Sequence, residues 1–469
     1  MKSILKALSA VALTGVMVLP VLADDATTTT DAKDSKDLKK VIEDQGINYV
    51  ETAQKGITLS GYVDVSYTEQ FGGRGTGFGP SQAQGHAFDV NNNNFNVQAV
   101  KIALEKALPD KNEWAAGFRI DTIYGADARE LGDTGLGQEG GSFALDNSSG
   151  FALEQALVKF RIPVGNGLDI YAGKFVTFLG YEVIESPANL NFSRGLLFTN
   201  AIPLTNTGVY ADYKFNDTFE AKFGVVDGWN NSVSPGELGN GGQTDAANDY
   251  PFGGKAITGQ LNITAPGKNA NIAQSFIYSP SGEPNSGTVG TGIDNGPVFV
   301  YDIWGNWNPT FVKDSALTLG FNVDFGYNGA SGEPFTDSPG FNNGSGLADG
   351  NSPDTNTWYG VALYASYKVN KVITLSARGE YLHEDSGSFP KFDVGQGGAE
   401  FQNVDDFSET LTASFAIWDN LLTRVEYRYD HVVSGTTTPG NETDRGSGPD
   451  NVATYQDQNE ISLEAVYSF

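Results

Sequence analysis

Residues 317–327, LTLGFNVDFGY, alternate between apolar side chains and small or polar ones. Leucine, phenylalanine, valine and tyrosine occupy the odd-numbered positions, and threonine, glycine, asparagine and aspartate occupy the even-numbered ones. A period of two is the pattern of a β-strand whose two faces meet different surroundings. The same alternation recurs at 57–67, 359–367, 373–381, 411–417 and 461–469. The sequence therefore predicts many strands with one apolar and one polar face.

Sixteen such stretches follow one another along the chain, and the connections between them alternate in length. The expected strands are 57–71, 94–107, 113–125, 151–162, 168–178, 206–215, 218–227, 255–265, 271–280, 297–307, 316–327, 357–369, 372–384, 406–417, 421–432 and 456–469. Short turns alternate with eight long segments rich in glycine, asparagine, aspartate and serine. Short turns at one end and long loops at the other are typical of up-and-down barrels in outer membranes. We therefore expect an all-β, transmembrane, antiparallel up-and-down β-barrel of about 16 strands over residues 56–469.

The N-terminal 55 residues differ from the rest. Residues 1–23 have the features of a signal peptide: Lys2 and Lys6, then an apolar stretch, then Val-Leu-Ala before Asp24. A membrane anchor is the alternative, but the apolar stretch is short and contains Pro20. Residues 24–55 combine a threonine run with weak helical spacing, which predicts a periplasmic tether with a short helix. A plug for the barrel is the alternative for this segment.

The charge of the chain is concentrated in the long segments. The formal net charge is −28, and there is no cysteine, which excludes disulfides, thiolate metal sites and cysteine nucleophiles. The acidic balance argues against nucleic acid as a partner. The eight long segments hold 24 acidic and five basic residues. We therefore expect an acidic cloud at the outer mouth, a mild cation preference, and divalent cations that bridge these loops to lipopolysaccharide phosphates.

All six tryptophans fall at or near the ends of expected strands. Four lie on the short-turn side and two on the long-loop side, in the order Trp114, Trp304, Trp307 and Trp418, then Trp229 and Trp358. Aromatic belts at the two membrane interfaces would produce this distribution. The chain also ends on Phe469 with Tyr467 on the same face, as in the terminal strands that outer-membrane assembly machinery recognises.

The third long segment, 179–205, is too apolar for an exposed loop. It contains two phenylalanines and several leucines and isoleucines. We expect it to fold inward, pack on the barrel wall and narrow the lumen. Its charged residues, Glu182, Glu185 and Arg194, would then lie at the pore constriction.

Strand parity predicts which charged residues line the pore. The inward faces of three strands carry Arg119, Asp121, Arg378, Glu380, Arg424, Glu426 and Arg428. Basic groups that face acidic groups across a narrow lumen would create a transverse field that orients polar solutes. The alternative is that these charges only solvate a wide aqueous channel.

Several motifs resemble those of the OmpL-like β-barrel porin family. They are GKF at 173–175, GYEVIE at 180–185, SR at 193–194, Pro203, TNTG at 205–208, GVVDGWN at 224–230 and RVEYR at 424–428. The resemblance covers the mature chain and is densest over about 155–230. It implies a diffusion pore in the outer membrane of a Gram-negative bacterium, with no specific solute. Homotrimerisation is expected by analogy with porins of this size.

No catalytic or metal-binding residues are predicted. The chain has three histidines, His86, His383 and His431, and none stands in a local signature with a serine nucleophile. Asp89, Asn91 and Asn93 have the spacing of a calcium loop, but the required glycine and the final glutamate are absent. No cofactor is expected beyond the divalent cations at the loops.

The leading hypothesis is a porin for ions and small hydrophilic solutes. The first alternative is an outer-membrane barrel that acts as an adhesin or as a sheath or scaffold for a partner protein, since the long loops are extensive. A soluble, secreted β-rich binding protein is a third option.

Overall fold

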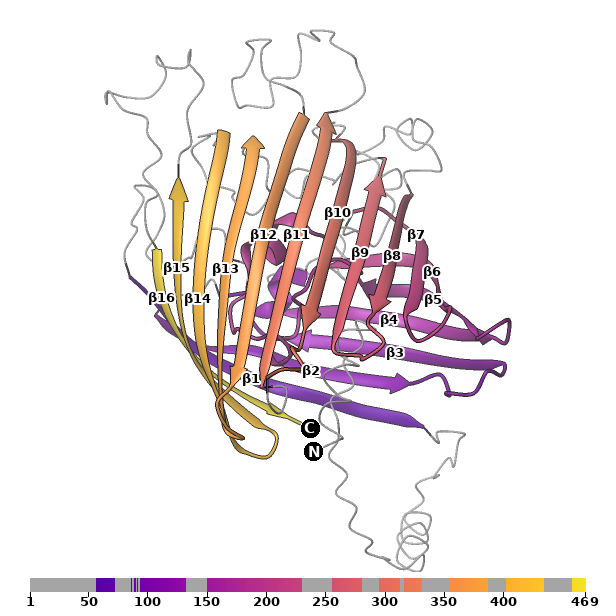
Figure 1. The fold of residues 1–469 in the computed structure, drawn as a ribbon, viewed down its shortest axis with the longest axis horizontal. Coiled ribbons are helices and arrows are strands. Elements are labelled where there is room, and N and C mark those ends of the chain that lie inside the picture. The colour runs from indigo at the N-terminus through magenta and orange to yellow at the C-terminus, as the bar shows by residue number, and fades with distance from the viewer. Residues whose placement is uncertain are drawn as a thin grey trace, which may run out of the picture.

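The structure is a closed antiparallel barrel in which every strand pairs with its neighbours in sequence (Figure 1). It is a computed structural model that describes residues 56–71, 86, 88–89, 91, 93–131, 150–229, 255–280, 295–312, 316–330, 355–386, 402–433 and 458–469. The predictions for residues 1–23 and 24–55 concern segments outside the described part of the chain. In Figure 1, β10 to β15 run steeply, whereas β1 to β4 run across the lower part of the view.

The described residues form sixteen strands, as the sequence predicts. Their bounds are β1 (Ile57–Phe71), β2 (Asn94–Lys106), β3 (Ala115–Tyr124), β4 (Phe151–Ile162), β5 (Leu168–Val176), β6 (Thr205–Lys214), β7 (Phe219–Val226), β8 (Ala256–Thr264), β9 (Ala270–Ser279), β10 (Asn295–Trp307), β11 (Leu317–Ala330), β12 (Thr355–Lys368), β13 (Ile373–Ser386), β14 (Gln402–Trp418), β15 (Leu421–Val433) and β16 (Gln458–Ser468). The described residues also form three short helices, η1 (Asp127–Leu131), η3 (Ser186–Ala188) and η4 (Leu197–Ala201). No helix among these residues is both long enough and apolar enough to cross a bilayer.

The first and last strands close the barrel. β1 pairs with β16 over ten residues, from Tyr62 opposite Ser468 to Phe71 opposite Asn459. The terminal residue takes part, because Gly61 and Phe469 exchange two backbone hydrogen bonds of 3.0 and 2.9 Å. Closure leaves no unpaired strand edge, which a membrane-spanning sheet requires.

Side-chain hydrogen bonds shape two of the short turns. Asn216 Oδ1 accepts hydrogen bonds from the backbone N–H groups of Thr218 and Phe219, at 2.8 and 2.9 Å. Asn370 makes the same pair of contacts two and three residues ahead, between β12 and β13. Asparagine thereby stabilises a tight reversal and fixes the register of the strands that it joins.

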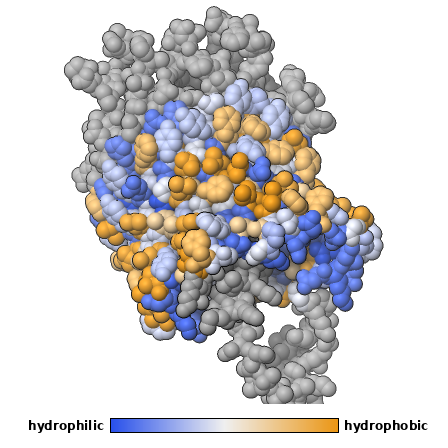
Figure 2. Space-filling view, viewed as in Figure 1, coloured by the Kyte–Doolittle hydropathy of each residue, from blue (hydrophilic) through white to orange (hydrophobic). Residues whose placement is uncertain are grey.

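The two faces of the barrel wall are chemically different. On β15, Val425 and Tyr427 are exposed on the outside, whereas Arg424, Glu426 and Arg428 are buried on the inside. Figure 2 shows apolar side chains gathered across the middle of the visible wall. Exposed apolar residues on the strands facing this view include Val323, Phe325, Tyr359 and Leu363. An apolar exterior and a charged interior are what a barrel in a bilayer requires.

The positions of the tryptophans contradict part of the predicted aromatic belts. Trp114, Trp307 and Trp418 are exposed at the short-turn end, as an aromatic belt requires. Trp229, Trp304 and Trp358 are instead buried inside the barrel. Trp229 and Trp358 pack edge to face, with ring centroids 6.4 Å apart. Trp304 on β10 and Trp358 on β12 lie at inward-facing positions, and Trp229 follows the end of β7. Proximity to a strand end therefore does not decide which tryptophans face lipid, and Trp229 and Trp358 form no exposed belt on the long-loop side.

Candidate pore constriction

Loop 3, defined here as residues 177–204 between β5 and β6, folds into the barrel. It contains η3 and η4, and its apolar side chains are covered: Phe192, Leu196 and Leu197 are each 1% exposed. Burying these side chains removes apolar area from water, which stabilises the inward position. The predicted inward fold of this segment is confirmed.

Arginines on one wall hold loop 3 in place. Arg378 on β13 donates to the Ser193 carbonyl at 2.7 Å and to the Ser193 hydroxyl at 3.0 Å. Arg424 on β15 donates to the carbonyls of Ser186 and Asn189 at 3.0 and 2.6 Å. Arg428 on β15 also donates to loop 3, with a hydrogen bond of 2.9 Å to the Arg194 carbonyl. We call Arg378, Arg424 and Arg428 the arginine latch.

A buried carboxylate completes this anchor. Glu426, between two residues of the arginine latch, accepts hydrogen bonds from the backbone N–H groups of Phe192 and Ser193, at 2.6 and 2.9 Å. The hydroxyl of Thr412 donates a third, at 2.6 Å. Glu426 is 2% exposed, so these charge-assisted bonds replace water around the carboxylate.

The three charged residues predicted at the constriction are buried inside the barrel. Glu182 pairs with Arg378 at 2.8 Å, and Arg194 pairs with Asp127 at 3.2 Å. Glu185 pairs with Lys101 on β2. Burial alone would raise the pKa of Glu185, but the Lys101 ammonium outweighs it and lowers that pKa to about 2. Each of these three charged side chains of loop 3 therefore has a partner of opposite charge inside the barrel.

All of the predicted lining residues face inward, but their pairing differs from the expected transverse field. Arg119 pairs with Asp121 at 2.7 Å, and Arg378 pairs with Glu380 at 2.8 Å, each within one strand. Arg428 pairs with Asp430 in the same way, at 2.8 Å. Residues two apart on a strand point to the same face. An arginine can therefore turn back to a carboxylate on its own strand, so these charges are neutralised locally rather than across the lumen.

Loop 3 also contacts β8, β11 and β12. The backbone N–H of Tyr181 donates to Asn322 Oδ1 on β11 at 2.6 Å, and Gln260 on β8 donates to the Phe178 carbonyl at 2.7 Å. The indole of Trp358 on β12 donates to the carbonyl of Ala201, at 3.1 Å. Loop 3 is thus bonded to β13 and β15 through charged groups, and to β8, β11 and β12 through amide and indole groups.

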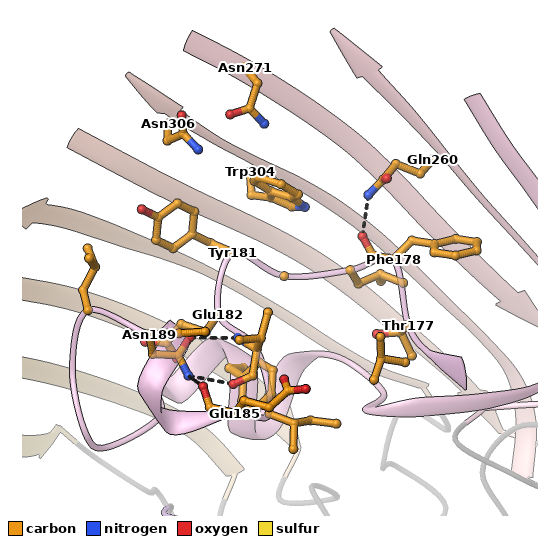
Figure 3. A pocket seen from close by; sticks show the side chains of 18 of the residues that line it. Thr177, Phe178, Tyr181, Glu182, Glu185, Asn189, Gln260, Asn271, Trp304 and Asn306 are labelled. Carbon is orange, nitrogen blue, oxygen red and sulfur yellow. Dashed lines mark hydrogen bonds between the residues drawn. The ribbon is translucent and has the colours of Figure 1, made fainter. Parts of the chain in front are cut away.

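A cavity of about 510 Å³ lies between loop 3 and the short turns. Figure 3 shows Phe178 and Tyr181 of loop 3 on one side of it, and Gln260, Asn271, Trp304 and Asn306 on the strands opposite. Its charged lining is mainly basic, with Arg119, Lys159, Lys214, Lys222, Lys268 and Lys368 against Glu182, Glu185 and Asp217. Arg119, Lys159, Lys214 and Lys222 are each paired with a carboxylate, so the basic excess of the cavity is smaller than this count of side chains.

Sequence reasoning missed several buried charged residues. Lys101 lies 2.8 Å from Glu154 and 3.3 Å from Asp121, and Glu464 pairs with Arg424 at 3.0 Å. Lys101 and Glu464 each lie on the polar face of an alternating strand, so parity alone would have found them. Contacts from η1 and the segment around His86 have no comparable signal, because they depend on how loops pack.

Comparison with known proteins identifies the family. The family model described as "Putative beta-barrel porin-2, OmpL-like" matches residues 56–469. Similar solved structures include OprB of Pseudomonas putida, with TM-score 0.51, 13% identity and coverage of 91% of this chain and 97% of that one. An anion-selective porin from Comamonas acidovorans has TM-score 0.50, 11% identity and coverage of 88% and 99%. No curated protein is significantly similar in sequence. The chain therefore belongs to the OmpL-like β-barrel porin family and is an outer-membrane channel of a Gram-negative bacterium.

Proposed function

We propose that the protein is a porin through which ions and small hydrophilic solutes diffuse passively. The observation that supports this most strongly is the contrast between an apolar outer wall and a charged interior, with loop 3 held inside. A barrel of about 16 strands is wide enough for an aqueous lumen, and an inward loop sets its width. Glu182, Glu185 and Arg194 lie at the narrowed level in this proposal. No enzymatic role is proposed.

Reconstitution into planar lipid bilayers tests the proposal. Folded protein, recognised by heat-modifiable migration in gels, is expected to insert in discrete conductance steps, and boiled protein should not. Folded protein that inserts into vesicles but gives no conductance would contradict diffusion through the barrel.

We also propose a mild cation preference. Of the 24 acidic and five basic residues of the long segments, Asp89, Asp127, Glu182, Glu185 and Arg194 are buried inside the barrel. The other 20 acidic and four basic residues carry a net charge of −16, which would concentrate cations within about 8–10 Å of the mouth at moderate salt. The basic cavity below loop 3 opposes this effect and keeps the preference small. Reversal potentials in a potassium chloride gradient measure it, and anion preference at low salt would refute it.

A scaffold or adhesin role is the second candidate. It is supported by the attachment of loop 3 across the lumen, through Gln260 on β8 and Arg424 on β15, since a barrel held shut would not conduct. An electrically silent barrel that retains one partner at fixed stoichiometry would favour this role over the porin.

The assembly and lipid partners are proposals as well. A homotrimer is expected by analogy with porins of this size. Lipopolysaccharide is expected around the outer mouth, with divalent cations bridging its phosphates to acidic loops. Chemical cross-linking in outer-membrane vesicles, with and without a chelator, measures both.

A further inference from the structure

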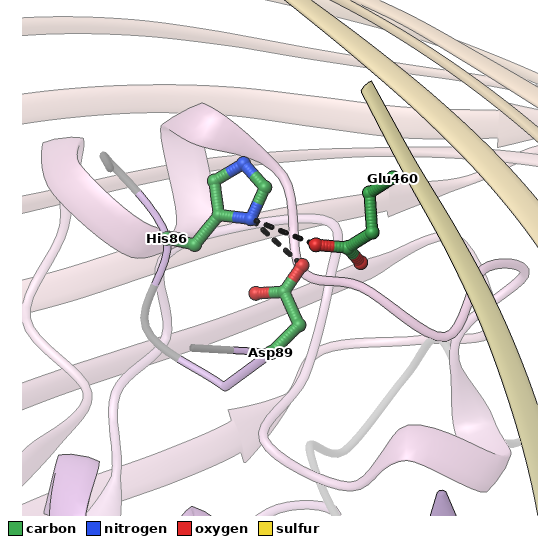
Figure 4. Close-up of side chains that lie close together, drawn as sticks. All are labelled: His86, Asp89 and Glu460. Atoms are coloured by element: carbon green, nitrogen blue, oxygen red, sulfur yellow. Dashed lines mark ion pairs between the residues drawn. The ribbon is translucent and has the colours of Figure 1, made fainter. Parts of the chain in front are cut away.

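One histidine and two carboxylates meet inside the barrel, beside the first residues of β16. His86 and Asp89 belong to the segment between β1 and β2, and Glu460 lies on β16 (Figure 4). His86 Nδ1 is 2.8 Å from Asp89 Oδ2 and 3.8 Å from Glu460 Oε2. The side chains are at most 1% exposed. Three potential ligand atoms therefore converge in a place that water does not reach.

The other ring nitrogen of His86 is already engaged. Its Nε2 lies 3.1 Å from Asp430 Oδ2, and Arg428 holds Asp430 through a hydrogen bond of 2.9 Å. If Nε2 of a neutral ring carries the proton and donates a hydrogen bond to Asp430, the lone pair is left on Nδ1, the nitrogen that faces Asp89. This carboxylate–imidazole arrangement is the usual outer support of a metal-binding histidine.

The contact between His86 Nδ1 and Asp89 Oδ2 is an ion pair if the imidazole is protonated, but it does not have the geometry of a hydrogen bond. In the described part of the chain, His86 Nδ1 and both carboxylate oxygens of Asp89 are buried without a partner in hydrogen-bonding geometry. With a neutral imidazole, lone pairs that face each other at 2.8 Å repel unless a cation lies between them, and the proton of an imidazolium is the alternative occupant of this contact. Asp89, Asp430 and Glu460 bring three negative charges, and Arg428 brings one positive charge, 3.7 Å from Asp89. A neutral imidazole therefore leaves a surplus that suits a divalent ion.

A second acidic group inside the barrel shows the contrast. Asp121, Glu154 and Glu185 also converge, but Lys101 Nζ lies among them, 2.8 Å from Glu154 and 3.3 Å from Asp121. The chain supplies its own cation there. In the group around His86, an imidazole nitrogen occupies the position that the ammonium of Lys101 occupies in the other group.

We propose that His86, Asp89 and Glu460 bind a divalent first-row transition-metal ion of the zinc or manganese type. One imidazole nitrogen with two carboxylate oxygens matches the ligands that these ions accept, whereas calcium and magnesium prefer oxygen alone. The bound ion joins His86 and Asp89 to β16. This site shares Arg428 with the arginine latch, and metal binding to it does not depend on porin activity.

Metal binding to the folded, full-length protein in detergent tests the proposal. The protein is stripped with a chelator, and Zn²⁺ is titrated by calorimetry, with Co²⁺ absorption as a spectroscopic probe of the ligand set. We expect one ion per chain. Asp430→Asn should weaken Zn²⁺ binding about 10–100-fold, as the loss of a residue that supports a metal ligand does. His86→Asn, Asp89→Asn and Glu460→Gln remove the ligands themselves, so each should weaken binding by at least this factor.

His383→Asn is the matched control, because His383 Nδ1 also faces a carboxylate, Asp405 Oδ1, at 2.7 Å on a neighbouring strand. It should leave binding unchanged. Heat-modifiable migration verifies that each variant is folded, and the Co²⁺ spectrum of the wild type gives a result that needs no variant. Absence of stoichiometric uptake, a Co²⁺ spectrum of the hydrated ion, equal binding of Ca²⁺, or uptake that survives all three ligand substitutions would each overturn the proposal. Equal binding of Ca²⁺ would indicate a site for hard cations, and uptake that survives the substitutions would indicate a site elsewhere in the protein.

Discussion

Substitution of Glu426 by glutamine should release loop 3. The carboxylate accepts from the N–H groups of Phe192 and Ser193, and glutamine offers a single oxygen in the same space. One backbone bond to a charged acceptor is then lost, which costs about 1.5–3 kcal/mol. Since about 1.4 kcal/mol is a factor of ten, the ratio of released to anchored loop should rise about 10- to 150-fold.

The cysteine-free chain provides a direct assay of this release. A single Leu190→Cys substitution places a thiol on the partly buried part of loop 3. If the loop opens and closes faster than a maleimide reacts, the labelling rate follows the population of the released state. The rate should therefore increase by the same factor in the Glu426→Gln background, and single-channel traces should show more frequent steps between levels.

Glu220→Gln is the matched control. Glu220 is also buried on the inner face, but its ion pair is with Lys222, 3.6 Å away on the same strand. It removes the same charge without touching the anchor, so labelling should stay at the wild-type rate. Equal labelling in the wild type, Glu426→Gln and Glu220→Gln proteins, all folded, would refute the anchoring role of Glu426.

Three further predictions concern the cavity, the wall and the aromatic packing. Lys159→Gln with Lys222→Gln removes two basic lining charges, so reversal potentials at low salt should move towards cations; a shift towards anions would contradict the charge assignment. Gly326→Ala would place a Cβ 1.8 Å from the Trp358 ring and should lower stability by about 1–3 kcal/mol in urea titrations, whereas Gly379→Ala meets nothing within 4 Å and should be neutral. Tyr181→Ala removes a ring whose centroid lies 4.3 Å from that of the Tyr364 ring, so single-channel conductance should increase. An unchanged conductance would place the narrowest point of the lumen elsewhere.

Local alternation was sufficient to predict the barrel. The stretch that contains Asn322 and Asp324 shows why: a period of two distinguishes the faces of a strand, and the lipid outside tolerates few charges. The expected strand 316–327 corresponds to β11, which runs from Leu317 to Ala330. Parity also placed the members of the arginine latch correctly on the inner face.

The contacts inside the barrel were not predictable in the same way. The burial of Trp358 depends on η4, more than 150 residues earlier, whose Ala201 carbonyl it meets. The ion pair between Lys101 and Glu185 likewise joins a strand to a loop that lies 84 residues further on. Such pairs leave no periodic signal, because the spacing along the chain does not determine how a loop packs.

The anchoring of loop 3 has a consequence for the order of folding. Its partners Arg378, Glu426 and Glu464 lie 185 to 278 residues further along the chain. Contacts this distant in sequence form slowly, because a long stretch of chain must first be ordered. Loop 3 therefore cannot reach its final position until β13 to β16 have formed. We expect refolding in detergent to show strand formation first and a separate, later phase in which the loop docks.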